Sequence, residues 1–554
     1  KVRAEDVPEI VTRHFAPRKR SVRIRSRMGK WLEQLYSDDH RNVLAEHSID
    51  TRDKPVAAFL DKQQRLATEY CGAIDPIDLD EYIRLDGFEA LNKCLLPASA
   101  NAAASEAALG PAAIIDTIRT SGLRGRGGAG FPTGQKWEVV RNAPGAKKYI
   151  VCNGDEGDPG AFMDRMILES YPFRVIEGMI IASLAVGAHE GILYIRAEYP
   201  LAVARVEEAL RICKDAGYLG ENIRGSRHTF HLRIMHGAGA FVCGEESALL
   251  AAVEGRRGTP SFRPPYPAQE GLYGCPTLVN NTETFALVPW IMRHGAEAFA
   301  ALGTVHSKGT KVFSLAGKVN RGGLIEVPMG TTIREIVEDI GGGVQGGKKF
   351  KAVQVGGPSG GCIPASLADT PIDYEALSAA GAMMGSGGLV VLDETDCMVE
   401  MTRYFLSFTQ WESCGKCPPC RVGTKRMLEI LERLCGGKAE AGDLAELEKL
   451  AHFVKNNSLC GLGKTAPNPV LTSLQYFRDE FEAHVEGRCP AGKCKNLITY
   501  SITEDCIGCT KCALNCPSGA IAFRPYEQHE IDPEKCTRCN GCFEICPVDA
   551  VKVE

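Results

Sequence analysis

Apolar and polar positions alternate with two different periods through the middle of the chain. Short apolar runs at Lys148–Cys152, Gly191–Arg196 and His231–Met235 predict strands. Between them, Glu169–Val186 and Leu201–Ala216 carry the amphipathic spacing of helices. Strands and helices that alternate in this way are typical of an α/β layer fold, so we expect a multidomain α/β protein.

The pattern changes after about residue 312. Strand-like runs at Val312–Leu315, Leu324–Val327 and Lys351–Val355 surround one helix-like stretch, Thr332–Ile340. Short strands around a single helix predict a small, ubiquitin-like β-grasp module.

The two ends of the chain differ from its middle. Residues 1–85 are charged and helix-forming, residues 396–484 are helix-rich with two cysteine-bearing loops, and the chain beyond Cys489 is cysteine-dense. These changes predict five parts: an N-terminal extension (1–85), an α/β domain (86–310), a β-grasp domain (311–395), a helical bundle (396–485) and a cysteine-rich domain (486–554).

Composition excludes some classes of protein. The 554 residues correspond to three to five domains at ~100–200 residues each. A net charge of −5 gives no argument for nucleic-acid binding, and no apolar run approaches the ~20 residues of a membrane span. The chain starts at Lys1 without a methionine or a signal-like segment, so we expect it to begin inside a longer chain.

The 23 cysteines indicate metal clusters in a reducing, cytoplasmic compartment, because those after residue 396 mostly lie in tight Cys-x-x-Cys runs. Two runs of the C-terminal domain repeat the spacing of bacterial two-cluster ferredoxins, in which the fourth cysteine of each run ligates the other cluster. Zinc fits eight cysteines in two identical runs poorly. The expected [4Fe–4S] ligand sets are Cys506, Cys509, Cys512 and Cys546 for one cluster, and Cys536, Cys539, Cys542 and Cys516 for the other.

A third [4Fe–4S] cluster is expected in the helical bundle, which we expect to be a four-helix bundle. Cys414, Cys417 and Cys420 lie on one loop, and Cys460 on a second loop is the best fourth ligand. An up-down bundle brings both loops to one end. Zinc remains the alternative for this site.

The opposite end of the same bundle predicts a zinc site. His484, Cys489 and Cys494 supply nitrogen and sulfur ligands there, and Cys397 completes a tetrahedral set, with Cys435 as the other candidate. The alternative is a group of ordinary buried thiols and a surface histidine.

A glycine-rich segment, Gly122–Gly134, lies before the first predicted strand of the α/β domain. Glycines let backbone N–H groups approach a phosphate or a ring, and Arg126 and Lys136 add positive charge. Alone, such a segment is as typical of a flexible linker. It has neither the P-loop pattern nor the strand–GxGxxG–helix setting of the usual dinucleotide fingerprint.

Two further segments strengthen the prediction of a nucleotide site. Asn153–Gly160 follows an apolar strand-like run and carries acidic residues where α/β folds bind ligands. Gly237–Ser247 is a second glycine-rich turn with two acidic residues, and it leads into a helix. For either segment alone, a turn with a helix cap is an equal alternative.

Together these motifs resemble the NADH-binding flavoprotein subunit of respiratory complex I. The resemblance rests on Gly122–Trp137, Asn153–Gly160, Gly237–Leu249, Arg263–Pro267, Pro276–Phe285 and Glu412–Cys420, and covers about residues 90–480. With its ferredoxin-like tail the chain is most similar to the flavoprotein subunit of NAD-dependent, electron-bifurcating [FeFe]-hydrogenases, with related subunits in formate dehydrogenase and benzoyl-CoA reductase complexes. Lys1–Phe15 resembles the end of the thioredoxin-like [2Fe–2S] domain that often precedes such subunits.

The resemblance implies a Rossmann-like domain that binds FMN and NAD(H). It places FMN against Gly125, Arg126, Gly127 and Lys136, with Asn153 and Asp155 near its ring or ribityl chain and Asn280, Asn281 and Thr284 at its phosphate. It places Glu156 opposite the nicotinamide. NAD contacts are expected from Gly244, Glu245, Glu246 and Arg263, with Phe131 and Tyr266 beside the adenine. A further adenine-stacking aromatic of the family aligns with Val139, so we expect looser adenine binding.

The expected activity is hydride transfer from NADH to FMN without a protein general base, with Glu156 as a protonation switch, followed by one-electron transfer to the Cys414 loop cluster. Expected partners are a small [2Fe–2S] subunit, a catalytic hydrogenase- or formate dehydrogenase-type subunit, and ferredoxin, without nucleic acid or membrane insertion. The alternatives are a flavin-free iron–sulfur relay or assembly subunit, and an NADH dehydrogenase subunit that does not bifurcate electrons.

Overall fold

The computed structural model describes residues 54–95 and 109–553. The chain divides into two compact units, Lys1–Ala57 and Ala58–Glu554, and the first lies almost entirely outside the described residues. The resemblance of Lys1–Phe15 to the end of a [2Fe–2S] domain concerns residues that are not described.

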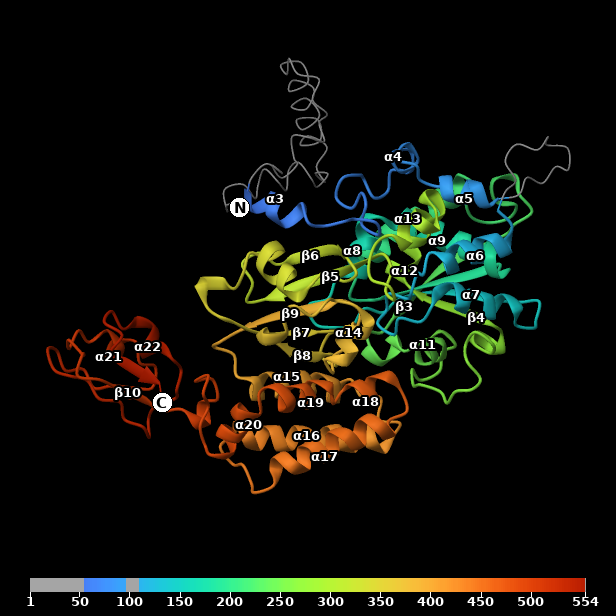
Figure 1. Ribbon diagram of the computed structural model, residues 1–554. Coiled ribbons are helices and arrows are strands. Elements are labelled where there is room, and N and C mark those ends of the chain that lie inside the picture. Colours follow the sequence, from blue (N-terminus) through green and yellow to red (C-terminus); the bar gives the residue numbers. More distant parts are fainter. Residues whose placement is uncertain (1–53, 96–108, 554) are drawn as a thin grey trace, which may run out of the picture. The chain divides into compact units, whose positions relative to one another are not determined.

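A four-stranded parallel sheet forms the centre of the α/β domain (Figure 1). In the order β3-β2-β1-β4, its strands are β1 (Tyr149–Gly154), β2 (Glu190–Arg196), β3 (His231–Gly237) and β4 (Thr277–Asn281). The chain adds β2 and β3 on one side of β1 and then returns to add β4 on the other. The strand order therefore reverses between β1 and β4, which is where open α/β sheets bind ligands.

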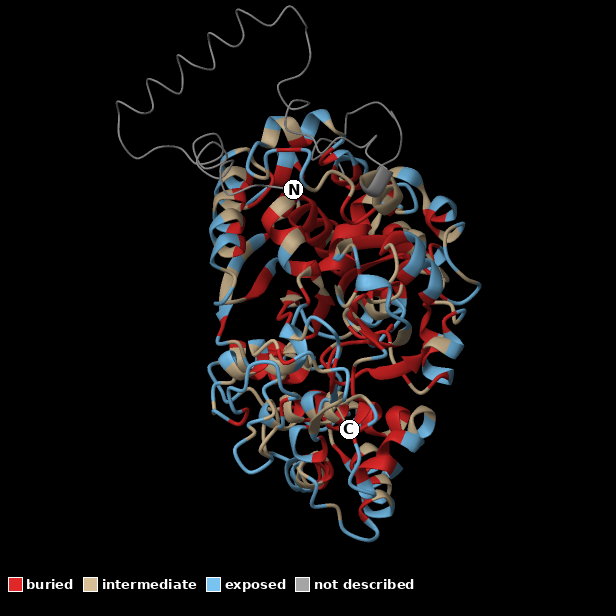
Figure 2. Cartoon of the chain, turned by 90° about the vertical axis from the view of Figure 1, so that its left-hand side faces the viewer, coloured by how far each residue is buried: buried red, intermediate tan, exposed pale blue. Residues whose placement is uncertain are grey.

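Helices pack around this sheet and bury at least one face in the core (Figure 2). They are α6 (Pro111–Thr120), α7 (Thr133–Asn142), α8 (Met163–Ser170), α9 (Pro172–Val186), α10 (Pro200–Asp215), α11 (Glu246–Val253), α12 (Thr282–His294) and α13 (Ala296–Ala300). The helix expected at Glu169–Val186 is present as α9, but it begins at Pro172, because Tyr171 separates it from the end of α8. Helices α9 and α12 cross closely at Gly178, where a Cβ atom would lie 2.1 Å from the carbonyl oxygen of Phe285.

The segment before the sheet belongs to the same hydrophobic core. It contains α4 (Leu79–Arg84) and α5 (Glu89–Cys94), after α3 (Lys54–Leu60). Leu66, Tyr82 and Phe88 are buried in the core that includes α9, and the Tyr82 hydroxyl donates a hydrogen bond to Glu177 (2.5 Å). The expected domain boundary at residue 85 is therefore not a boundary in packing.

A five-stranded mixed sheet forms the next part of the chain. Its order is β6-β5-β9-β7-β8, with β5 and β9 parallel at the centre and the other pairs antiparallel. The strands are β5 (Thr310–Gly317), β6 (Gly323–Pro328), β7 (Phe350–Val355), β8 (Gly361–Pro364) and β9 (Gly388–Asp393). The helical segments η4 (Glu335–Ile340) and α14 (Tyr374–Ala379) contribute Ile336, Val337 and Leu377 to its core.

The cysteine-bearing loops of residues 396–485 connect helices. These are α15 (Met398–Trp411), α16 (Pro418–Cys435), α17 (Asp443–Asn457), α18 (Gly461–Thr465), α19 (Asn468–Tyr476) and α20 (Arg478–Val485). The remaining C-terminal elements are β10 (Tyr500–Ile502), α21 (Lys511–Leu514), α22 (Gly541–Ile545) and β11 (Val551–Val553), and β10 pairs with β11. Short 3₁₀ turns occur at η1 (Ile223–Gly225), η2 (Phe241–Gly244), η3 (Leu272–Gly274), η5 (Gln345–Gly347), η6 (Ala365–Leu367) and η7 (Lys495–Leu497). None of the described helices has the length and apolar character needed to cross a bilayer.

Candidate functional site

Polar side chains converge where the strand order of the parallel sheet reverses. Asn153 at the end of β1 is the register partner of Asn281 at the end of β4. The Asn153 amide donates to the carbonyl oxygen of Gly244 in the second glycine-rich turn (2.9 Å), and the Asn281 amide donates to Asp164 at the start of α8 (2.6 Å). Three segments that are far apart in sequence therefore meet at the ligand-binding edge of the sheet.

The glycine-rich segment folds back on itself before α7. Its Gly125 N–H donates to the Phe131 carbonyl oxygen (2.9 Å). A Cβ atom on Gly127 would lie 3.2 Å from Cβ of Asn281, so the glycine allows the segment to approach the end of β4 closely. The guanidinium of Arg126, from which we expect a positive charge beside a ligand, already has partners within the protein. It is buried and donates to three backbone carbonyls, those of Arg124, Lys308 and Thr310.

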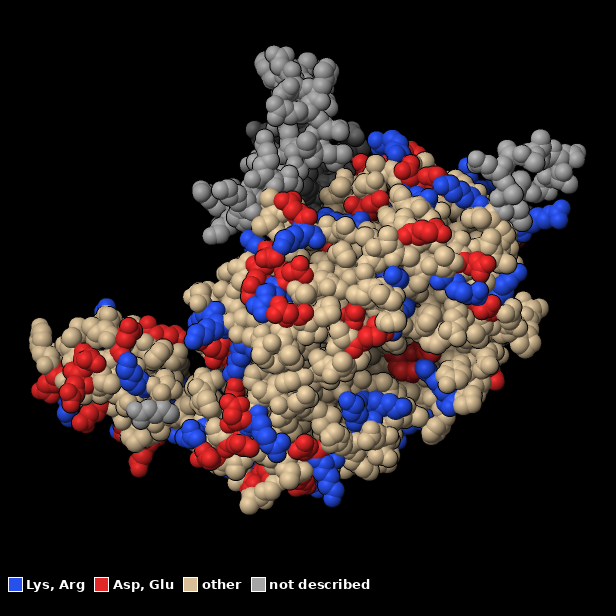
Figure 3. All heavy atoms as spheres, viewed as in Figure 1, with Lys and Arg blue, Asp and Glu red and all other residues tan. Residues whose placement is uncertain are grey.

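Lys136 connects the glycine-rich segment with the second turn. Its ammonium group donates to Glu246 at the start of α11 (2.9 Å) and to the Val279 carbonyl oxygen (3.0 Å). Arg263 forms a second ion pair with Glu246 (3.2 Å) and another with Glu245, which caps α11. Burial raises the pKa of Glu246, but Lys136 and Arg263 outweigh that effect, and the pKa is lowered. Figure 3 shows acidic atoms in a hollow of the surface where Figure 1 draws α11, with basic side chains at its border.

Asp155 provides a test of whether this site fits a ligand. Both of its carboxylate oxygens are buried and have no hydrogen-bond partner among the described residues. Burial raises the pKa of Asp155 to about 7. An unpaired buried carboxylate is costly, so a molecule with N–H or O–H donors, such as a flavin, fits here.

Glu156 is more enclosed than its expected place opposite a nicotinamide requires. Its two carboxylate oxygens accept hydrogen bonds from the N–H groups of Asp164 and Arg165 in the first turn of α8 (3.1 Å each). The Tyr199 hydroxyl donates to its carbonyl oxygen (3.1 Å). Burial raises the pKa of Glu156. The Glu156 carboxylate thus accepts hydrogen bonds from free N–H groups at the N-terminus of α8. Glu156 follows Asp155 on the same loop.

Several buried charged side chains near Glu156 were not predicted from the sequence. Asp164 is fully buried near Glu156, and Glu283 forms a buried ion pair with Lys311. Burial raises the pKa of Asp164, and the charges of Glu156 and Glu283 act in the same direction. The available signal was the presence of charged residues in helices that are otherwise apolar.

The side chains expected at the phosphate end of the flavin already have partners within the protein. Asn280 accepts a hydrogen bond from the Trp137 indole (3.0 Å), and Thr284 accepts one from the Arg126 N–H (2.9 Å). Asn281 caps α12 by accepting the N–H of Glu283 (2.9 Å). The N-terminus of α12 nevertheless lies at this edge of the sheet, and a helix N-terminus favours anions.

The expected adenine neighbours are exposed. Phe131 is 47% exposed, Tyr266 52% and Val139 38%. A cavity of about 570 Å³ adjoins Arg263. Its lining includes residues that the sequence analysis did not single out: Glu254, Arg256, Phe262 and Tyr273.

The Cys414 loop is joined to the nucleotide segments by three hydrogen bonds. Glu412 accepts the N–H of Phe241 (3.0 Å), Lys416 donates to the Pro260 carbonyl oxygen (2.5 Å), and Arg257 donates to that of Cys414 (3.2 Å). Burial, followed by the nearby charges of Cys417, Cys460 and Cys414, raises the pKa of Cys420 to about 11. The loop that carries Cys460 meets the Cys414 loop, because a Cβ atom on Gly463 would lie 3.1 Å from Cβ of Cys420.

The C-terminal runs also bring their cysteines together. One cavity is lined by Cys516 of the first run and by Cys536, Cys539 and Cys542 of the second. Burial, then the charges of Cys506 and Cys509, raises the pKa of Cys512 in the other expected set. Ala520 donates its N–H to Cys516 (3.2 Å), and Ala550 donates to Cys546 (3.3 Å) in the equivalent position of the second run.

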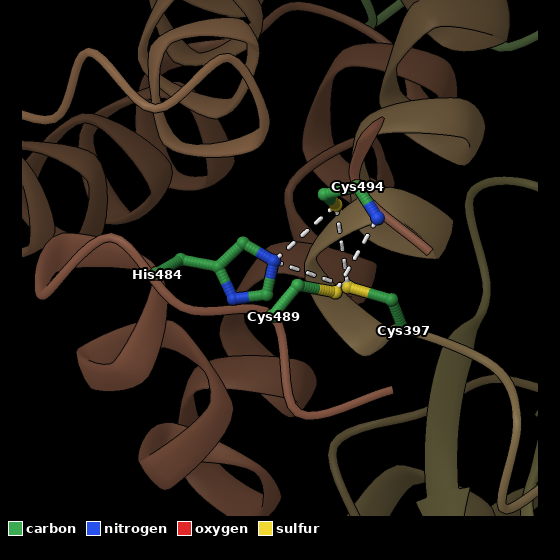
Figure 4. A group of neighbouring side chains, drawn as sticks. All are labelled: Cys397, His484, Cys489 and Cys494. Carbon is green, nitrogen blue, oxygen red and sulfur yellow. Dashed lines mark hydrogen bonds between the residues drawn. The ribbon is translucent and has the colours of Figure 1, made fainter. Parts of the chain in front are cut away.

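Cys397, His484, Cys489 and Cys494 form a buried group, and their ligand atoms lie within 4.8 Å of one another (Figure 4). The His484 Nε2 atom lies 3.3 Å from the sulfurs of Cys397 and Cys494, which are 3.8 Å apart. A tetrahedral zinc with bonds of ~2.3 Å to sulfur holds its sulfurs at about this separation. His484 Nδ1 contacts the Glu480 carbonyl oxygen (2.7 Å), which orients the ring. Cys435 belongs to a second group, with Glu400 and Cys494.

Comparisons with known proteins agree with this arrangement. Residues 118–290 match the Nuo51 FMN-binding domain, residues 400–484 the NADH-ubiquinone oxidoreductase-F iron–sulfur binding region, and residues 501–553 a 4Fe-4S dicluster domain. The chain is 50% identical to the HndC subunit of the NADP-reducing hydrogenase of Solidesulfovibrio fructosivorans, over 88% of this chain and 92% of that protein. It is 45% identical to an NADH-quinone oxidoreductase subunit of Rhizobium meliloti (strain 1021), over 69% of this chain and 90% of that one.

A solved structure is similar as well. A chain of an NAD⁺-reducing [NiFe]-hydrogenase in the H₂-reduced state superposes with a TM-score of 0.65 at 33% identity, covering 85% of this chain and 74% of that one. The parallel-sheet domain, the iron–sulfur helical region and the ferredoxin-like tail therefore each match a known protein family. This chain belongs to the family of NADH-binding, FMN-containing iron–sulfur flavoprotein subunits found in NADH-quinone oxidoreductases and related hydrogenases.

Proposed function

We propose that this chain oxidises NADH at a bound FMN and conducts the electrons singly through its own [4Fe–4S] clusters. A nicotinamide delivers two electrons as a hydride and a cluster accepts one, and FMN, when bound, can exchange electrons in both ways. The observation that carries the proposal is the turn at 237–247. It contacts Asn153 on one side and the Cys414 loop, through Glu412, on the other.

The residues have separate tasks in this proposal. The backbone of Gly125–Gly127 and the side chains of Lys136, Asn153 and Asp155 hold the flavin. The helix N-terminus beside Asn280, Asn281 and Thr284 faces its phosphate. Gly244, Glu245, Glu246 and Arg263 bind the NAD ribose and phosphates, with Phe131 and Tyr266 at the adenine. Glu156 adjusts nicotinamide binding through its protonation state, from the buried position in which its carboxylate accepts the N–H groups of α8.

The test separates this proposal from that of a flavin-free iron–sulfur relay. The purified chain should release FMN on boiling, and NADH should bleach its flavin absorbance under anaerobic conditions. Glu156→Gln should change the KM or kcat for NADH with an electron-accepting dye and leave the flavin content unchanged. A preparation with full iron content, no flavin and no bleaching by NADH would favour the relay.

Three [4Fe–4S] clusters and one zinc ion complete the proposed cofactor set. The Cys414, Cys417, Cys420 and Cys460 thiolates hold the first cluster, and the two sets of the tail hold the others. Cys397, His484, Cys489 and Cys494 hold zinc. The sulfur–sulfur and sulfur–nitrogen distances support zinc, as do the N–H groups of Lys493 and Cys494, which donate to Cys489 (3.3 and 3.4 Å) and stabilise a thiolate.

We further propose that the chain works in a cytoplasmic complex with a small [2Fe–2S] subunit and a catalytic subunit, and that it divides the electrons of NADH between that partner and ferredoxin. The ferredoxin-like tail supports bifurcation because it offers a second route for electrons. In the purified complex, NADH oxidation should then require both acceptors together, whereas activity with either acceptor alone would indicate a plain NADH dehydrogenase.

The domain interpretation is part of the same proposal. Residues 311–395 form a β-grasp domain, which is supported by the parallel pair β5 and β9 at the centre of the sheet. Residues 396–485 form a helical bundle, and cysteine-bearing loops connect its helices.

A further inference from the structure

His529 is a buried histidine in the ferredoxin-like tail that no part of the proposed function uses. It lies between the two cysteine runs and is 2% exposed. Its Nδ1 atom lies 3.7 Å from the sulfur of Cys506, the first cysteine of the first run. Its Nε2 atom is buried and has no hydrogen-bond partner among the described residues. Within the described part of the chain, the imidazole therefore has one polar contact, the one with Cys506.

The loop that carries His529 is fixed against the first cysteine run. The Tyr526 N–H donates to the Gly508 carbonyl oxygen (3.0 Å), and the Gln528 amide donates to that of Ile502 (2.9 Å). Gly508 has a φ of +63°, and a Cβ atom there would lie 2.6 Å from the backbone of Tyr526 and Glu527. Because the glycine permits this close approach, one backbone and one side-chain hydrogen bond fix the segment just before His529 against the first run.

The direction of the hydrogen bond follows from the chemistry of the two groups. A thiolate that ligates iron has no proton and can only accept. The proton in this contact must therefore be on Nδ1, and Nε2 stays buried without a partner among the described residues. A buried polar group left unpaired costs ~1–3 kcal/mol, so the histidine is an expensive residue to keep at this position for packing alone.

We propose that His529 donates its Nδ1–H to the Cys506 thiolate and thereby raises the reduction potential of the cluster held by Cys506, Cys509, Cys512 and Cys546. Reduction adds one electron to the cluster and makes its sulfurs more negative. A hydrogen bond to sulfur stabilises the more negative state more strongly, and such bonds are among the factors that set cluster potentials. No proton or covalent bond is transferred.

The two cysteine runs differ at this point. The backbone bonds from Ala520 to Cys516 and from Ala550 to Cys546 are equivalent in the two runs. The contact of His529 with Cys506 has no counterpart at Cys536 among the described residues. Ser518 lies 3.6 Å from Cys516, but it is half-buried, so water can replace its hydroxyl, whereas water cannot replace the buried imidazole. His529 therefore acts on one cluster of the pair.

The inference rests on the proposed clusters, and its test compares His529→Leu with His529→Asn in the full chain. Asparagine places an amide N–H close to the position of Nδ1, and leucine has a similar shape without a donor. In EPR-monitored redox titrations, His529→Leu should lower the midpoint potential of one cluster and leave the other clusters unchanged. His529→Asn should stay near the wild-type value, with equal iron content in all three proteins.

A second measurement detects the hydrogen bond itself. Pulsed EPR of the reduced wild-type protein labelled with ¹⁵N-histidine should show a nitrogen coupling on the cluster signal that His529→Leu shifts. Full iron content with unchanged potentials, or with no nitrogen coupling, overturns the inference and leaves the proposed function intact. Iron sufficient for only one cluster would overturn both the inference and the proposed cofactor set, because the tail would then hold no clusters.

Discussion

The carboxylate of Glu412 accepts a hydrogen bond from the backbone N–H of Phe241, with 3.0 Å between Oε2 and N. Glu412 precedes the Cys414 loop, and Phe241 lies in the turn that leads to Glu245 and Glu246. This bond, with those of Arg257 and Lys416, fixes the expected cluster loop against the expected nucleotide site.

Removing this acceptor should loosen the nucleotide turn. A hydrogen bond to a charged group contributes ~1.5–3 kcal/mol, so Glu412→Ala should increase local opening by about 10- to 100-fold. Hydrogen exchange of peptides covering residues 237–247 measures this change. Glu412→Gln keeps an acceptor and should preserve most of the protection. Equal exchange in wild type and Glu412→Ala would show that the bond does not hold the turn.

Asp155 should make the flavin-free protein less stable as the pH rises. Its carboxyl ionises near 3.8 in the unfolded chain, but burial raises the pKa to about 7 in the folded state. The folded state therefore loses stability between about pH 4 and 7, by a few kcal/mol at most. Asp155→Asn cannot ionise, so its stability relative to wild type should be similar near pH 4 and increase up to about pH 7.

Thermal unfolding of the flavin-free proteins at pH 5 and pH 8 measures the Asp155 effect. The exposed Asp80→Asn substitution controls for the loss of a charge. A difference between Asp155→Asn and wild type that is the same at both pH values would contradict the prediction. Asp155→Asn should also release FMN more readily, which gel filtration followed by flavin fluorescence detects.

Zinc content should depend on Cys489 and not on Cys435. Cys489 lies in the buried group with Cys397, His484 and Cys494, whereas Cys435 belongs to a different group that shares only Cys494. Elemental analysis should find one zinc per chain in wild type and Cys435→Ser, and a loss of zinc in Cys489→Ser with iron unchanged. Equal zinc loss in both variants would mean that Cys435 is also a ligand.

An aromatic residue at position 139 should tighten NADH binding. The family resemblance places an adenine-stacking side chain here, and Val139 is 38% exposed on α7. Aromatic stacking contributes ~0.5–1.5 kcal/mol, so Val139→Phe should lower the Kd for NADH by about 2- to 10-fold. Val139→Leu adds apolar surface without stacking and serves as the control. An unchanged Kd, or an equal effect of leucine, would place the adenine elsewhere.

Some strands of the α/β domain follow from the sequence pattern, and one does not. The three expected strands of the α/β domain are present as β1, β2 and β3. The strand β4 was not predicted as a strand, although it creates the reversal of order that forms the site. A five-residue strand rich in asparagine has little periodicity, and only its pairing with β1 reveals it.

The sequence by itself determined the spacing of the cysteines, and this spacing predicts the ligand sets, because it limits which thiolates of a run can reach one metal. It also selected Cys397, His484, Cys489 and Cys494, since helix lengths decide which end of a bundle each residue occupies. Only the tertiary structure decided the environment of the charged groups. It directed the Arg126 guanidinium to backbone carbonyls, left Asp155 buried without a partner among the described residues and brought His529 to Cys506. Burial and hydrogen-bond partners come from segments distant in the chain, so the residues next to a group in the sequence do not predict them.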